Sequence, residues 1–128
     1  MNETENGFVK NIILLNAIGD VVVGVMLTFF FKTMTQMMDF VFSDQAWFLS
    51  GGWGMGAISY AILRFYTFNK PKYYDLTVKF GLAEGGLLII YCVVMWIITE
   101  LSFAQVAVSL FFALFFTILY GFAFQKQN

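Results

Sequence analysis

Three charged side chains, Asp20, Arg64 and Glu84, lie inside long apolar stretches of this sequence. An ionised side chain at the centre of a bilayer costs at least about 2.5–3.5 kcal/mol, so such residues normally face a protein interior and mark a site. Asp20 is the clearest case, because it is the tenth residue of the 21-residue apolar run Asn11–Phe31. At about 1.5 Å per residue, a helix of that length spans the roughly 30 Å hydrocarbon core.

The depths of these three residues in the predicted helices allow them to meet. Counted from the centres of the apolar stretches, Asp20 lies near the midplane, Glu84 a few ångströms from it, and Arg64 roughly 10 Å from it on the side of Glu84. The arginine side chain is long enough to bond Glu84 and to reach Asp20. Tyr60 and Asn16, each one helical turn before a charged residue, could add a hydroxyl and an amide.

Two interpretations of this polar group are open. The three charges could do no more than fix the register of the helices. Alternatively, because two acids face one strong base, Asp20 and Glu84 could bind a proton, an ion or a ligand inside the protein. The chain has no histidine and one cysteine, so we expect no cofactor and no metal site of the haem, iron–sulfur, zinc or copper kind.

The composition indicates an integral membrane protein. Hydrophobic residues make up 60% of the chain and charged residues 12%, and the mean hydropathy is +0.78, values far from those of soluble proteins. We predict a single all-α domain over residues 1–128, an antiparallel bundle of transmembrane helices. The four predicted spans are 9–31, 46–68, 76–98 and 101–124.

The lysine and arginine positions predict the orientation. Four spans put both termini on one side, together with six of the seven cationic residues: Lys10, Arg64, Lys70, Lys72, Lys79 and Lys126. The positive-inside rule therefore places both termini in the cytoplasm. The other side has only Lys32, in the segment 32–45. A short amphipathic helix on the membrane surface is predicted there, from the helical spacing of Met34, Met37, Met38 and Val41.

Small residues at helical spacing predict how the spans pack, because membrane helices associate where small side chains let their backbones approach. The expected packing positions are Gly24, Gly52, Gly56, Gly85 and Gly121. The Gly52-x-x-x-Gly56 pair could pack within the bundle or between two copies of the chain.

The order of these parts resembles the DoxX-like small four-helix membrane proteins of bacteria and archaea. The resemblance lies in a polar-striped first span, a short amphipathic segment (32–45), a glycine-rich second span (GGWGMGAISYAILRF, 51–65) and an antiparallel pair that ends the chain. It implies a four-helix bundle in a prokaryotic cell membrane, in some members tied to respiratory or quinone-linked complexes. It implies no catalytic residue.

We therefore expect a non-catalytic accessory or structural subunit of a larger membrane complex. The alternative is a small oligomeric transporter or channel that uses Asp20 and Glu84. An enzyme is not expected, because no histidine is present to activate a serine nucleophile. The expected partners are the lipid bilayer and other membrane subunits or a second copy. Nucleic acid is not expected, since the net charge is −1.

Overall fold

The computed structural model describes residues 3–127, and the predicted all-α class is confirmed over that range. The elements are α1 (Glu3–Phe29), α2 (Phe31–Met37), α3 (Asp44–Thr67), the 3-10 turn η1 (Pro71–Tyr73), α4 (Tyr74–Ile98) and α5 (Phe103–Gln127). The predicted domain covers residues 1–128, of which residues 1, 2 and 128 lie outside the described range.

Within residues 3–127, three segments are long and apolar enough to cross a membrane: Asn6–Phe29, Pro71–Ile98 and Phe103–Gln127. They indicate an integral membrane protein. Helix α3 is 24 residues long but is not among them. Its four glycines, together with Ser50, Ser59 and Arg64, lower its hydropathy. A membrane span at 46–68 therefore stays a prediction.

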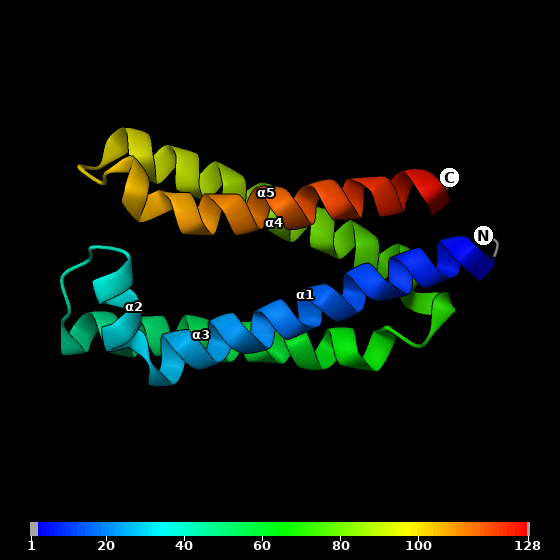
Figure 1. Cartoon of the computed structure of the whole chain (residues 1–128), viewed down its shortest axis with the longest axis horizontal. Helices are drawn as coiled ribbons and strands as arrows, with labels where there is room; N and C mark the ends of the chain where they lie inside the picture. The colour runs from blue at the N-terminus through cyan, green and yellow to red at the C-terminus, as the bar shows by residue number, and fades with distance from the viewer. Residues whose placement is uncertain (1–2, 128) are drawn as a thin grey trace.

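The long helices form two pairs, α1 with α3 and α4 with α5, and the two helices of each pair run in opposite directions (Figure 1). Contacts join α1 to α3 from one end to the other. At one end, Trp47 Nε1 donates to the Thr28 carbonyl at 2.8 Å. At the opposite end, the Lys10 ammonium lies 5.6 Å from the centre of the Phe68 ring. Helix α3 therefore accompanies α1 over nearly its whole length.

Glycine allows the closest approach within each pair. A Cβ added to Gly24 of α1 would lie 2.7 Å from the Gly54 carbonyl oxygen of α3, and a Cβ on Gly54 would lie 2.7 Å from the Gly24 oxygen. Between α4 and α5, a Cβ on Gly85 would overlap the Thr117 hydroxyl. Helices α1 and α3 are thus packed backbone against backbone, whereas in the second pair side chains of α5 fill the space that the glycines of α4 leave.

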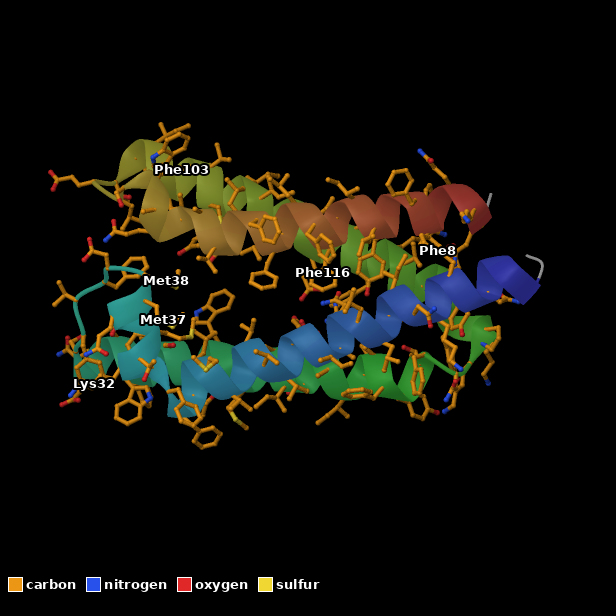
Figure 2. All side chains as sticks on the ribbon, in the orientation of Figure 1. Phe8, Lys32, Met37, Met38, Phe103 and Phe116 are labelled. Carbon is orange, nitrogen blue, oxygen red and sulfur yellow. The ribbon has the colours of Figure 1, made fainter. Side chains whose placement is uncertain are left out.

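The two pairs join mainly at the end where the chain termini lie together (Figure 1). The buried apolar cluster at this end draws on α1, α4 and α5 and consists of Val9, Ile12, Ile13, Tyr74, Val78, Tyr120 and Ala123. Farther along, Phe116 of α5 projects between the pairs (Figure 2) and lies 3.5 Å from where a Cβ on Gly19 would be. The pairs meet from this level to the termini.

The chain between α1 and α3 differs from the expected surface helix over 32–45. Helix α1 ends at Phe29, and the next helix, α2, covers only residues 31–37. It ends because Asp39 adopts a left-handed conformation, with φ 57°, and the Phe40 N–H turns back to the Thr35 carbonyl at 2.8 Å. Val41, expected on the apolar face of the helix, lies in the following loop and is 89% exposed.

Helix α1 begins at Glu3, six residues before the predicted limit at 9, and the limits of α3, α4 and α5 lie within three residues of the predicted ones. Helix α3 begins after the N-cap Ser43, whose hydroxyl accepts from the Ala46 N–H at 3.1 Å. Helix α5 begins after Ser102 rather than at residue 101, and extends to Gln127. The Ser102 N–H donates to the Gln105 side chain at 2.8 Å, while Gln105 also donates to the Asp39 carbonyl at 2.7 Å. This second bond ties the loop after α2 to the start of α5.

Candidate functional site

Three of the long helices bring a charged side chain to one place between the two helix pairs. Arg64 of α3 donates through Nη1 to Asp20 Oδ2 of α1 and through Nη2 to Glu84 Oε2 of α4. We call Asp20, Arg64 and Glu84 the charge cluster. The structure thus brings together the three charged residues that the depth count placed near one another, and the arginine bonds both acids at once.

The members of the charge cluster differ in burial and in the number of their partners. Arg64 is only 1% exposed, whereas the Asp20 and Glu84 side chains are 15% and 31% exposed. Asn16 donates to the second oxygen of Asp20 at 3.2 Å, one helical turn away, as its spacing predicts. Asp20 is therefore held by two donors, while the bond from Arg64 is the one that holds Glu84.

Aromatic rings flank the guanidinium. The Arg64 Cζ lies 6.0 Å from the centre of the Tyr60 ring and 5.9 Å from that of Phe80, distances at which a cation is attracted to a ring face. The two rings pack edge to face, with centroids 5.3 Å apart. Tyr60 therefore meets Arg64 through its ring and not, as expected from the sequence, as a hydroxyl donor.

Helix α5 contributes a residue that sequence reasoning missed, Tyr120. Its side chain is fully buried, its ring lies where a Cβ on Gly81 of α4 would be, and it interacts electrostatically with Arg64. Its hydroxyl and the Arg64 Nε are buried atoms without a hydrogen-bond partner among residues 3–127. Tyr120 follows Ala113, a small residue of α5 that is buried against Gly85 of α4, by seven residues and so lies on the same helix face. This spacing is the signal that could have found it.

Of the five glycines expected at helix contacts, two lie at contacts of the kind expected. Gly24 packs on α3 and Gly85 packs on α5, whereas a Cβ on Gly52, Gly56 or Gly121 would meet nothing within 4 Å. On α3 the contact with α1 is made by Gly54 instead. Two residues along a helix correspond to a rotation of about 200°, so Gly52 and Gly56 point away from α1.

The charge cluster can do two things chemically. It links the two helix pairs, because Arg64 holds one acid from each pair. It also has more acidic than basic groups, since two carboxyl groups share one guanidinium. Within residues 3–127, no three His, Cys, Asp or Glu side chains come close enough to hold a metal ion together.

No protein-family model, curated protein or solved structure matches this chain. The resemblance to DoxX-like proteins therefore stays a prediction from the order of the sequence elements. The charge cluster and the surfaces of the helices are therefore the features of the molecule that bear on its function.

Proposed function

We propose that this protein is a non-catalytic membrane protein that serves as an accessory subunit of a larger membrane assembly. The observation that carries the proposal is one surface of α3, which we call the open face: Phe48, Gly52, Met55, Gly56 and Ser59. All of these residues lie away from α1, and a Cβ on either glycine would meet nothing within 4 Å. The open face is therefore free to accept another helix.

Glycine and serine on an outer helix face favour a protein neighbour over lipid. Small residues let two backbones approach closely, and close packing is what drives helices together in a bilayer. A shallow hollow of about 440 Å³ adjoins the open face and could seat a side chain of a partner. Its lining is Thr28, Asp44, Trp47, Phe48, Gly51, Gly52 and Met55.

The proposal includes α3 as a fourth span of an antiparallel bundle. Its 24 residues correspond to about 36 Å, enough to cross the hydrocarbon core. The position of α3 beside α1, which is a candidate span, supports a common depth for the two helices in the membrane. Lys32 lies at the end of the molecule opposite to the termini (Figure 2), so the positive-inside rule favours cytoplasmic termini. From the DoxX-like resemblance, we propose a prokaryotic cell membrane.

Cysteine labelling tests this topology. In a Cys92→Ala background, we expect an impermeant maleimide added to intact cells to modify a cysteine placed at position 44 but not one placed at position 72. Position 72 should become reactive once the membrane is permeabilised. The reverse pattern, or equal labelling of both positions in intact cells, would contradict the four-span topology.

Photo-crosslinking tests the accessory role. A benzophenone amino acid at Met55, on the open face, should give a covalent product of discrete mass with a different membrane protein. The matched control is Ile90 of α4, which is similarly exposed but lies outside the open face and should give no such product. A product at both positions, or at neither, would refute the proposed docking surface.

The alternative is a small oligomeric transporter or channel that uses Asp20 and Glu84. One observation favours it: the two acids share a single base. The same crosslink decides between the two functions, because a product with twice the mass of the chain shows self-association. Such a product would favour the oligomer over the accessory subunit.

A further inference from the structure

We propose that the charge cluster is a binding site for one proton, which the carboxyl groups of Asp20 and Glu84 share. The inference goes beyond the accessory role, because it concerns the interior of the chain and holds whether or not a partner covers the open face. It rests on the charge balance of the cluster, on the coordination that its atoms can offer, and on the buried hydroxyl of Tyr120.

With both acids ionised, the charge cluster carries a net charge of −1. The other polar groups that face it are the phenols of Tyr60 of α3 and Tyr120 of α5, neither of which supplies a positive charge. The nearest lysine along α4, Lys79, bonds the exposed Asp75 at 2.8 Å. Four further lysines lie against aromatic rings elsewhere in the described range: Lys10, Lys70, Lys72 and Lys126. Lys32 lies at the end of the molecule opposite to the termini (Figure 2), so within residues 3–127 Arg64 is the cation available to the two acids.

An uncompensated charge at this depth is expensive. Even on the mildest scales, a charged side chain at the centre of a membrane helix costs about 2.5–3.5 kcal/mol. Two carboxylates brought to one site seldom both stay ionised, because each raises the cost of ionising the other. Binding one proton leaves one carboxylate opposite one guanidinium and makes the cluster neutral.

A proton suits the site better than a metal ion does. Hard cations such as Ca²⁺ and Mg²⁺ take about six or more oxygen ligands. Here three of the carboxyl oxygens already accept from the N–H donors of Arg64 and Asn16. The Tyr120 hydroxyl adds one further oxygen, so the cluster falls short of six free oxygen ligands. A proton needs a single carboxyl oxygen, on which it forms an O–H bond.

The new O–H group also needs an acceptor, and Tyr120 supplies one. Its hydroxyl is wholly buried, lies near Arg64 and both acids, and makes no hydrogen bond of ordinary geometry within residues 3–127. Because both acids bond the same guanidinium, we assign the bound proton to the pair rather than to either residue.

Infrared spectroscopy of the full chain in phospholipid vesicles tests the proposal. At neutral pH we expect the C=O stretch of one protonated carboxyl group per chain. Replacing either acid, by Asp20→Asn or by Glu84→Gln, should abolish this band, because one acid and one base then remain and the acid stays ionised. The control Asp75→Asn removes an exposed acid of α4 and should leave the band unchanged.

Isotope labelling of the wild-type protein tests the proposal even if a variant fails to fold. Wild-type protein labelled with carbon-13 in aspartate or in glutamate should show a shifted band with at least one of the labels. Any of three results would overturn the proposal: a folded wild type that lacks the band, a band that remains in both the Asp20→Asn and the Glu84→Gln variant, or a band that neither label shifts. So would loss of the band when sodium chloride replaces choline chloride, since a metal ion would then compete. Failure of the Met55 crosslink would refute the accessory role alone.

Discussion

Replacing Arg64 with methionine will destabilise the folded protein by about 3–5 kcal/mol, the usual cost of removing one partner from a buried ion pair. The loss is large because Arg64 holds both acids, and its removal leaves Asp20 and Glu84 facing each other without a cation. Adding Asp20→Asn and Glu84→Gln to Arg64→Met should restore much of the stability. The free energy of unfolding in mixed micelles, followed by circular dichroism, measures each step.

A double-mutant cycle of Arg64→Met and Glu84→Gln should show strong coupling between the two positions. The matched control is the exposed pair of Lys79 and Asp75 on α4. There Lys79→Met should change the free energy of unfolding by no more than about 1 kcal/mol, as is typical of surface pairs. Additive effects of Arg64→Met and Glu84→Gln would show that the bond between the two helix pairs does not contribute to stability.

Gly54→Ala will destabilise the contact between α1 and α3, whereas Gly56→Ala will not. A Cβ at Gly54 would lie 2.7 Å from the Gly24 carbonyl oxygen, a backbone atom that cannot rotate away. Overpacking of this kind typically costs about 1–3 kcal/mol. At Gly56 the same Cβ meets nothing within 4 Å, so the change should stay within about 0.5 kcal/mol.

The two alanine variants form a matched pair, because both replace a glycine of the same helix and gain the same intrinsic helix propensity. Their difference in unfolding free energy therefore isolates the packing of α1 on α3. Equal stability of the two variants would contradict the close approach of Gly24 and Gly54. Equal stability would also show that α3 can turn about its own axis without cost.

The meeting of Asp20, Arg64 and Glu84 could be predicted because depth along a helix depends only on the fixed rise per residue. Apolar runs bounded by charged residues likewise locate the long helices to within a few residues. For the same reason Asn16, one turn from Asp20, was expected beside it.

The rotation of each helix about its axis could not be predicted in this way. In soluble proteins the apolar face marks the interior, but lipid is as apolar as a protein core, so hydropathy does not distinguish the two faces of a span. That is why Gly54 rather than Gly52 or Gly56 meets α1, and why Tyr120 was missed. The early end of α2 depends on one left-handed residue, Asp39, which helical spacing does not reveal.

The pairing of α1 with α3 and of α4 with α5 has a consequence for the order of events during synthesis. Since the amino-terminal part of a chain emerges first, α1 and α3 can associate while α4 and α5 are still being made. Asp20 then meets Arg64 as a neutral couple before Glu84 is available. Glu84 arrives later, with the second pair, and adds a second acid. The joining of the two halves is therefore the step at which the acids of the cluster first outnumber its single base.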